Sequence, residues 1–450
     1  MISAKLYKIF SAICILLVFA KCVEEYNERD FEKLYNFNEL KEDYTELVDV
    51  LKEWHPNLKH PLNRRLFNNY TDSVFYSINS KMNLTDFYII LSEVISKINC
   101  GHSFLEIPGE YWRVGNEKLK YLPFKLCFIK EKAFIQKNFS GIDYLKPGME
   151  ILSINSIPIK QIIKSFLRIY SSDGNNITYK YHKMNALAFG LFPGYAEFPD
   201  FYEIDYLSKE NNEIESTRVG AKSLRDIRKF AESSYSKFES FPAYDFRIID
   251  SINTGLLNIY TFSIDRESEY NEFLENIFKS IKLKKLDNLI LDVRNNDGGT
   301  PYPAAELLSY LTDKEFIYFR QNVIGYSDLK ISKYPKQNNF TGKLYILING
   351  GCFSTTCHLI SLIKHLNVGL LIGEETGGTY KCNGCDYNDK LPNTKIEYHC
   401  ARCVYRTNVF GFNSNRGILP DFEVNPSIED LIEEKDAVLD FTLTLIKNEH

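Results

Sequence analysis

A serine follows a sharp turn in the stretch Lys343–Cys357, whose sequence is KLYILINGGCFSTTC. Residues 343–348 form a short apolar run that predicts a buried strand, and Asn349-Gly350-Gly351 ends it. Apolar residues at helical spacing follow Ser354, which predicts that this serine lies at the start of a helix. The unpaired N–H groups of a helix start favour negative charge, so such a serine can act as a nucleophile beside oxyanion donors. An ordinary helix cap is the competing interpretation, because serine is also a preferred capping residue.

Two histidines are candidates for the base that such a serine requires. His102 lies in Asn99–Ser103, where a glycine breaks the chain after a predicted helix. His358 lies one helical turn after Ser354, and its simpler interpretation is a packed helix residue. Histidine is the commonest general base, but a lone histidine is also commonly structural, so position alone does not decide between them.

The elements around these residues alternate between strands and helices from Tyr244 onward. This alternation predicts a mostly parallel sheet with helical crossovers, in which ligands bind beyond the carboxyl ends of the strands. The loops Asn295–Gly299 and Gly350–Ser354 each follow a predicted strand, so we expect both to face one site. Gly298 and Gly299 would let the backbone approach a substrate closely.

The N-terminus has the pattern of a secretory signal peptide over residues 1–22, with Lys5 and Lys8 before a short apolar run. An uncleaved anchor is the alternative. Residues 23–107 are predicted to be helical, residues 108–225 to form a β-rich module, and residues 226–450 to form the α/β domain. The polar run Ser208–Arg228 is the expected linker.

Composition points to a secreted globular protein. The chain has 450 residues, 44% of them apolar, and its net charge of −5 provides no basic surface for a nucleic acid. No phosphate-binding loop motif is present in the sequence. Five sequons would be glycosylated in the secretory pathway, at Asn69, Asn83, Asn138, Asn176 and Asn339.

Four cysteines have the spacing of a structural zinc site, Cys382, Cys385, Cys400 and Cys403. Two disulfides are the other interpretation, since Cys382 would face Cys403 and Cys385 would face Cys400 across one hairpin. Secretion favours disulfides, and the paired spacing favours zinc. Cys352 or Cys357 as a thiol nucleophile is a third hypothesis for the chemistry, although a secreted cysteine beside others is usually oxidised.

Five sequence blocks together resemble the S41 serine peptidases, the C-terminal or tail-specific processing peptidases. They are Ile98–Ser103, Leu291–Gly299, Asn349–Ser354, Gly373–Gly378 and Gly417–Asp421. The resemblance covers nearly the whole chain after the predicted signal peptide, and the order and spacing of the blocks make it specific.

The resemblance implies a ClpP/crotonase-like catalytic α/β domain, a helical N-terminal region and a PDZ-like module in residues 108–225. It implies Ser354 as nucleophile, His102 as base, as in the tricorn-like branch, and the amides of Gly298, Gly299 and Thr355 as the oxyanion hole. It further implies a peptide or protein substrate and no cofactor for catalysis.

The sequence departs from the family pattern at several positions. The bacterial branch has a lysine base after the Thr-x-Gly block, whereas Thr379 follows that block here and Lys381 is off register. The tricorn-like branch has a glutamate where this chain has Ser414-Asn415, so Glu375 becomes the candidate that orients His102. These departures keep a second hypothesis open, a catalytically degenerate protein that binds a peptide or a hydrophobic ligand, like the retinoid-binding relative of the family.

Overall fold

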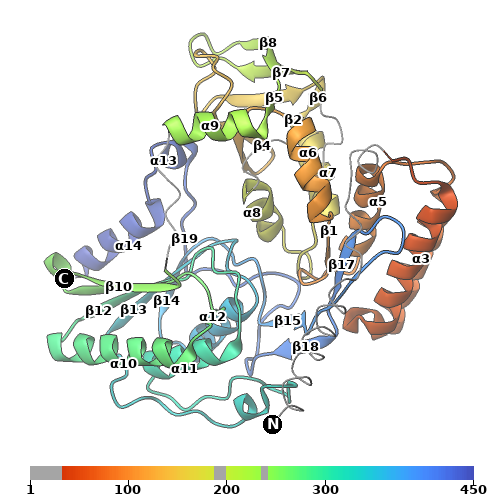
Figure 1. Ribbon diagram of the computed structural model, residues 1–450. Helices are drawn as coiled ribbons and strands as arrows, with labels where there is room; N and C mark the ends of the chain where they lie inside the picture. Colours follow the sequence, from red (N-terminus) through yellow and green to blue (C-terminus); the bar gives the residue numbers. More distant parts are fainter. Residues whose placement is uncertain (1–32, 187–198, 235–241, 450) are drawn as a thin grey trace, which may run out of the picture.

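The computed structural model describes residues 33–186, 199–234 and 242–449. The predicted signal peptide lies outside these residues. The described residues form an N-terminal group of helices, a β-rich module and a domain around a central sheet (Figure 1). None of the described helices has the length and apolarity that crossing a membrane requires.

The central sheet has the order β10-β11-β12-β13-β14-β19 and is parallel except for its antiparallel edge strand β10. Its strands are Tyr244–Ile249, Thr254–Ile259, Asn288–Asp292, Lys343–Ile348, Leu370–Gly373 and Phe422–Glu423. The parallel sheet predicted from the alternating pattern is therefore present, and the loops after β12 and β13 lie at the same edge of it.

Helices cover both faces of this sheet. In β12, Leu289 and Leu291 pack with helices α10, α11 and α12, whereas Ile290 packs with helix α14 on the other face. These helices are Glu267–Lys284, Pro301–Leu311, Thr355–Leu366 and Ala437–Asn448. A strand buried on both faces has a continuous apolar sequence, which is why this strand could be recognised.

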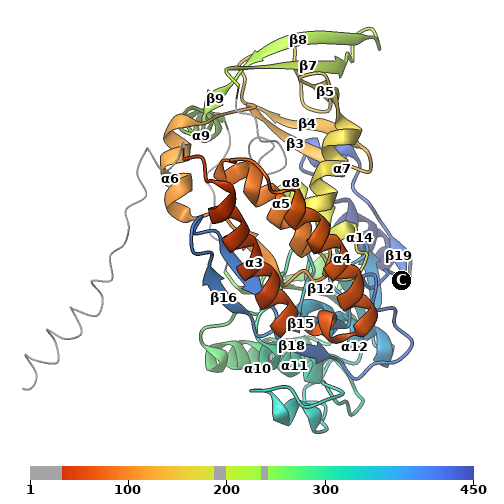
Figure 2. The same cartoon turned by 90° about the vertical axis from the view of Figure 1, so that its right-hand side faces the viewer.

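The N-terminal group contains α3 (Phe37–Trp54), η1 (Pro56–Lys59), α4 (Pro61–Ser77) and α5 (Leu84–Ser96). It shares a core with a three-stranded sheet of β1 (Phe104–Glu106), β17 (Glu397–Cys400) and β16 (Tyr387–Lys390). Figure 2 shows α3 and α4 on the same side of the molecule as this sheet. Segments nearly 300 positions apart in the sequence thus pair directly, with Phe104 opposite His399.

The β-rich module is a sheet of order β3-β4-β5-β7-β8 with its own apolar core, and β6 pairs with β5. The strands β3 to β8 are Phe124–Ile129, Lys132–Asn138, Glu150–Ile154, Ile157–Pro158, Phe201–Leu207 and Ile214–Gly220. Helices α7 (Ile159–Ile169) and α8 (Thr178–Ala186) lie between its strands in sequence.

The linker prediction at Ser208–Arg228 is wrong. That run contains strand β8, the short strand β9 (Lys222–Ser223) and the start of helix α9 (Leu224–Ser234). Strand β8 is an edge strand with few buried side chains, so its sequence is polar although its backbone is paired. Helix α9 contacts α6 (Gly109–Lys118), and β9 pairs with β2 (Lys120–Tyr121).

The C-terminal segment forms two helices, α13 (Ile428–Ile432) and α14. Glu434 has a φ of 54° in the break between them. Asp436 then caps α14 by accepting the Leu439 N–H. Two 3-10 turns complete the described elements, η2 (Asp250–Ile252) and η3 (Ser327–Lys330).

The four clustered cysteines lie along the two arms of one hairpin, residues 381–406. Strands β15 (Lys381–Gly384) and β18 (Cys403–Arg406) pair so that Cys382 faces Tyr405 and Cys403 faces Gly384, while Cys400 faces Tyr387. The strand register is shifted by two residues from the predicted one, so neither predicted disulfide pair is formed. All eight cysteines of the described residues are free, and no group of His, Cys, Asp or Glu there is arranged to hold a metal. Within the described residues, the zinc prediction is therefore unsupported, and neither predicted disulfide is shown.

Candidate active site

Ser354 occupies the sharp turn between strand β13 and helix α12. Its backbone has φ 49° and ψ −122°, a conformation that is strained for a residue with a side chain. Its side chain makes no capping hydrogen bond to the helix, so the interpretation of Ser354 as an ordinary helix cap is wrong. A strained strand-to-helix turn that exposes a serine Oγ is the geometry of nucleophile elbows.

His102 meets Ser354 although the two residues are 252 positions apart, with Nε2 3.0 Å from Oγ. The loop that carries it follows helix α5, and Asn99 with a φ of 54° turns the chain out of the helix. Burial, together with the smaller effect of the positive charge of Lys183, lowers the pKa of His102 to about 4. The imidazole is therefore neutral at pH 7 and free to accept a proton.

The ring of His102 is held by aromatic contacts. It stacks on Phe353 at 4.7 Å, and Phe353 stacks on Tyr179 at 4.3 Å. Gly101 has no room for a side chain, because a Cβ there would lie 2.5 Å from Cζ of Phe353. Phe353, the residue before Ser354, thus fixes the plane of the His102 ring.

The interpretation of Glu375 as the orienting acid is wrong in this structure. Its carboxylate accepts hydrogen bonds from the Arg416 guanidinium at 2.9 Å and from the Gly417 N–H at 2.8 Å. Nδ1 of His102 is buried and has no hydrogen-bond partner within the described parts of the chain. The Ser–His pair therefore lacks a carboxylate third member among these residues.

One of the three predicted oxyanion donors is occupied. The Gly298 N–H donates to Oδ1 of Asn296 at 2.9 Å, so this amide is not available and its assignment is wrong here. Gly299 lines the same cavity as Ser354. Among the described residues, no hydrogen-bond acceptor takes the N–H of Gly299 or of Thr355. These two amides remain the candidates for the oxyanion hole.

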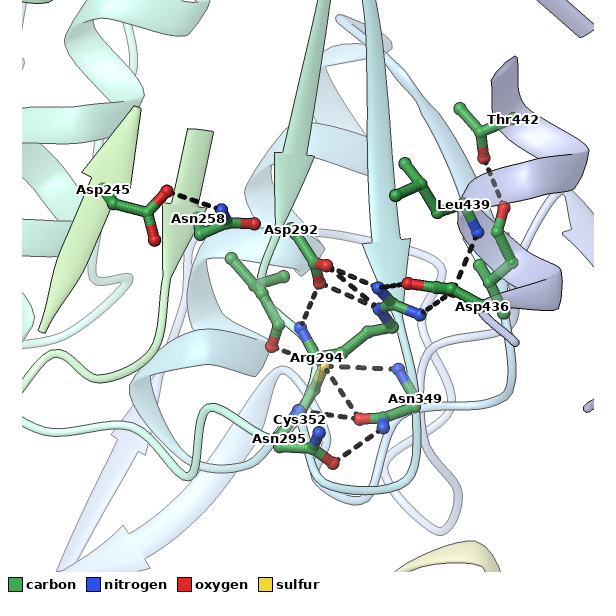
Figure 3. A network of polar contacts seen from close by, with 12 residues as sticks. Asp245, Asn258, Asp292, Arg294, Asn295, Asn349, Cys352, Asp436, Leu439 and Thr442 are labelled. Atoms are coloured by element: carbon green, nitrogen blue, oxygen red, sulfur yellow. Dashed lines mark hydrogen bonds and ion pairs between the residues drawn. The ribbon is translucent and has the colours of Figure 1, made fainter. Parts of the chain in front are cut away.

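A polar network fastens the two loops together (Figure 3). Asn349 Oδ1 accepts the Asn295 N–H at 2.9 Å, and Asn349 Nδ2 donates to Asn295 Oδ1 at 2.8 Å. Behind them, Arg294 pairs with Asp292 at 2.6 Å and with Asp436 at 2.7 Å. These charged hydrogen bonds hold the pKa of Arg294 above its ordinary value. They also connect the loop Asn295–Gly299, here called the glycine loop, to the start of α14.

A cavity of about 500 Å³ opens at Ser354 and His102. Most of its walls are apolar or aromatic, and Lys183 and Asp297 are its charged groups. The apolar and aromatic wall residues include Tyr88, Ile95, Phe104, Leu105, Ile169, Tyr170 and Tyr179. Such a wall suits apolar groups of a ligand.

The rival residues do not reach this cavity. His358 is buried in α12, with Nε2 3.3 Å from Sγ of Cys382, and burial lowers its pKa to about 3. Cys352 and Cys357 are fully buried, and burial raises the pKa of Cys357 to about 12, so the thiol-nucleophile hypothesis is wrong. Lys381 lines a different cavity.

The sequons differ in accessibility. Asn69 is exposed on α4. Asn176 is 2% exposed, and its Nδ2 donates to the Thr376 carbonyl at 2.8 Å, so the folded protein has no space for a glycan there and this prediction is wrong. The side chains of Asn83 and Asn138 make local hydrogen bonds, and Asn339 Nδ2 donates to the Thr312 carbonyl.

Sequence reasoning missed Phe353, Tyr179, Asn296 and Asp173. Phe353 precedes the nucleophile and was visible in the motif, but its stacking partner is distant in sequence. Asp173 stands in the polar turn Ser171–Asn176, which reads as an exposed loop, although the side chain is only 5% exposed.

Comparison with known proteins supports the fold and the family. Residues 253–424 match peptidase family S41; this range contains Ser354 and the glycine loop, and His102 precedes it. No curated protein matches the chain.

The fold resembles that of mature CPAF, with 15% identity and a TM-score of 0.65 over 92% of this chain and 98% of the other. Mature CPAF complexed with lactacystin gives 14% identity and 0.65 over 91% and 98%. The photosystem II D1 C-terminal processing protease gives 14% identity and 0.43 over 89% and 98%. Over residues 253–424, the chain is thus similar to peptidase family S41, a family of serine peptidases.

Proposed function

We propose that the protein is a secreted serine peptidase that hydrolyses peptide bonds through an acyl-enzyme. The observation that carries this proposal is the 3.0 Å contact between His102 Nε2 and Ser354 Oγ at a strained turn. The match of residues 253–424 to peptidase family S41 supports the same reaction class.

In the proposed reaction, Ser354 Oγ attacks the scissile carbonyl carbon while its proton passes to Nε2 of His102. The amides of Gly299 and Thr355 donate to the oxyanion of the tetrahedral intermediate. The C–N bond then breaks, and His102 returns the proton to the leaving amine. Water attacks the remaining ester in the second half, with His102 again accepting and returning one proton.

The proposed substrate is an extended peptide, including the C-terminal part of a protein. The apolar cavity beside Ser354 supports apolar side chains near the cleaved bond. We propose that residues 108–225 are a PDZ-like module, which presents a peptide by strand addition at a sheet edge. The edges of its sheet are β3 and β8. Residues 226–450 would then be the ClpP/crotonase-like catalytic domain.

Secretion through a signal peptide at residues 1–22 is part of the proposal, and it rests on the sequence pattern. The exposed Asn69 is the sequon best placed for a glycan. After signal cleavage we expect no membrane partner.

One observation favours the second candidate function, a peptide-binding protein without activity. Nδ1 of His102 has no acceptor within the described residues, and a triad without its acid is weaker by orders of magnitude. Labelling by an active-site probe separates the two functions.

The deciding experiment is labelling with a fluorophosphonate, which reacts with an activated serine. We expect the wild-type protein to be labelled, and Ser354→Ala to lose labelling and peptide hydrolysis, by about 10³-fold or more. Ser361→Ala is the matched control, since Ser361 lies two turns further along α12 and bonds to Thr407 instead. Absence of labelling in the folded wild-type protein would contradict the peptidase proposal and leave the binding function.

A further inference from the structure

The orientation of His102 needs an explanation, because no carboxylate contacts its ring among the described residues. Ring stacking on Phe353 sets the plane of the imidazole, but a stacked ring can still slide within that plane. The backbone of His102 must therefore be held in place by the contacts that its loop, Asn99–His102, makes with the rest of the protein.

Asp173 binds this loop. Its Oδ1 accepts the Gly101 N–H at 2.9 Å, one residue before His102, and the side chain is 5% exposed. Next to it, the Gly174 N–H donates to the Asn99 carbonyl at 3.2 Å. Two hydrogen bonds thus hold the loop: the Asp173 carboxylate accepts one from it, and the Gly174 N–H donates one to it.

The same short segment also binds the catalytic domain. The Asn175 N–H donates to the Asn415 carbonyl at 2.8 Å, and Asn176 Nδ2 donates to the Thr376 carbonyl at 2.8 Å. We call residues Asp173–Asn176, between α7 and α8, the clasp.

The clasp leads on to the nucleophile. The loop with Thr376 continues to Gly377 and Gly378, whose N–H groups donate to the Cys352 carbonyl at 3.0 and 3.1 Å. Cys352 is two residues before Ser354. A continuous chain of hydrogen bonds therefore runs from the His102 loop through the clasp to the Ser354 turn.

The clasp packs too closely against its neighbours to accept a side chain at Gly174. Gly174 has a φ of +58°, and a Cβ at this position would lie 2.5 Å from Cα of Asn415. Because backbone packs closely against backbone here, the clasp has a single position relative to the two loops that carry Thr376 and Asn415. The other oxygen of Asp173, Oδ2, is buried and has no partner within the described residues, and Asp173 lines a cavity that Lys381 also lines.

We propose that Asp173 is a positioning residue for His102, which anchors the backbone of the base where the usual carboxylate would anchor its ring. This inference rests on the proposed function, since it assumes that His102 accepts the proton of Ser354. An ångström of misplacement costs about 100-fold in rate, so a lost anchor is measurable.

The test compares Asp173→Ala with Asp173→Asn in the full chain. Asparagine keeps an Oδ1 that accepts the Gly101 N–H, whereas alanine does not. We expect D173A to slow fluorophosphonate labelling by about 10- to 100-fold and to lower kcat at an unchanged KM, because Asp173 does not line the substrate cavity. D173N should retain most of the wild-type rate. Asp143→Ala, at an exposed aspartate of the same module, is the control.

A second readout needs no activity. NMR of the histidine side chains should show the His102 ring signals shifted in D173A and native in D173N, with buried His358 unchanged as an internal reference. Should D173A not fold, D173S replaces it, because the serine side chain is too short to reach the Gly101 amide.

The outcomes separate the two proposals. Wild-type labelling together with equal rates for D173A, or equally slow rates for D173A and D173N, would overturn the positioning role alone. Unlabelled wild-type protein would contradict the proposed function. The NMR signals of the His102 ring would then test by themselves whether Asp173 positions His102, and native ring signals in D173A would overturn that role.

Discussion

Burial affects the imidazole of His102 in two opposing ways. Because burial lowers the pKa of His102, the neutral form dominates at pH 7, which a proton acceptor requires. The same burial reduces the basicity of the ring, and no carboxylate of the described residues compensates by contacting Nδ1. Activity would therefore be modest in size but would extend to acidic pH.

The pH profile of kcat/KM tests this consequence. The base must be unprotonated, so activity rises with pH through the pKa of His102, and the acid limb should lie near pH 4. Lys183→Met removes a positive charge that disfavours the imidazolium, so the limb should move to higher pH. An acid limb at the ordinary histidine value of about 6.5 in the wild-type protein would contradict the effect of burial.

At the level of residues, the sequence motifs singled out Ser354 and His102, whose side chains lie 3.0 Å apart in the structure, and their catalytic roles stay a proposal. The sequence was insufficient for Glu375 and Gly298. Their roles depend on hydrogen-bond partners that only the folded chain supplies, Arg416 for the carboxylate and Asn296 for the amide.

At the level of elements, the loop after β12 has a fixed backbone conformation because it lies against the end of β11. Phe262 N–H donates to the Gly298 carbonyl at 2.8 Å, and Thr300 N–H donates to the Phe262 carbonyl at 3.1 Å. Gly299 sits between these bonds with a φ of 137°. The arrangement holds the peptide unit of Gly299 against a strand end while the residue faces the cavity.

Gly299→Ala should disrupt this arrangement. A Cβ there would lie 2.1 Å from the carbonyl carbon of Phe262, so we expect a loss of roughly 3 kcal/mol in unfolding free energy and loss of serine labelling. Urea unfolding and the fluorophosphonate reaction measure both effects.

Gly325→Ala separates backbone strain from collision. Gly325 also has a positive φ, of +83°, but no atom lies within 4 Å of its Cβ position. Its substitution should cost about 1 kcal/mol and leave labelling intact. Equal effects of the two substitutions would show that collision with Phe262 is not the cause.

Elements with strong apolar patterns were predictable, and elements with weak ones were not. Strands β12 and β13 are buried on both faces and were recognised from their sequences. Strand β8 is mostly exposed, so its polar sequence resembled a linker. The hairpin with the cysteines was expected, but its register follows from strand pairing and turn geometry, which spacing alone does not encode.

At the level of the whole molecule, the N-terminal helices are joined to a hairpin from the C-terminal third. Asp43 of α3 is fully buried and accepts the N–H groups of Asn393 and Thr394 at 2.8 Å each and the Thr394 hydroxyl at 2.6 Å. One carboxylate thus satisfies the turn of the β16–β17 hairpin.

Asp43→Ala should destabilise the protein by roughly 3 kcal/mol, because it leaves buried donors without an acceptor. Denaturant unfolding measures the loss, and hydrogen exchange should show early opening of residues 387–400. Asp49→Ala is the control, since Asp49 lies on the same helix but is exposed. Equal stability of the two variants would contradict the proposed tie.

The pairing of β1 with β17 has a consequence for synthesis. The strand directly after His102 finds its partner only at residues 397–400, and Ser354 is itself made late. A ribosome adds residues from the N-terminus, so the imidazole emerges long before the hydroxyl and before the strand that holds its loop. During translation the proposed site would therefore exist as two separate, inactive parts. The growing chain could not hydrolyse other proteins before its last quarter had left the exit tunnel of the ribosome.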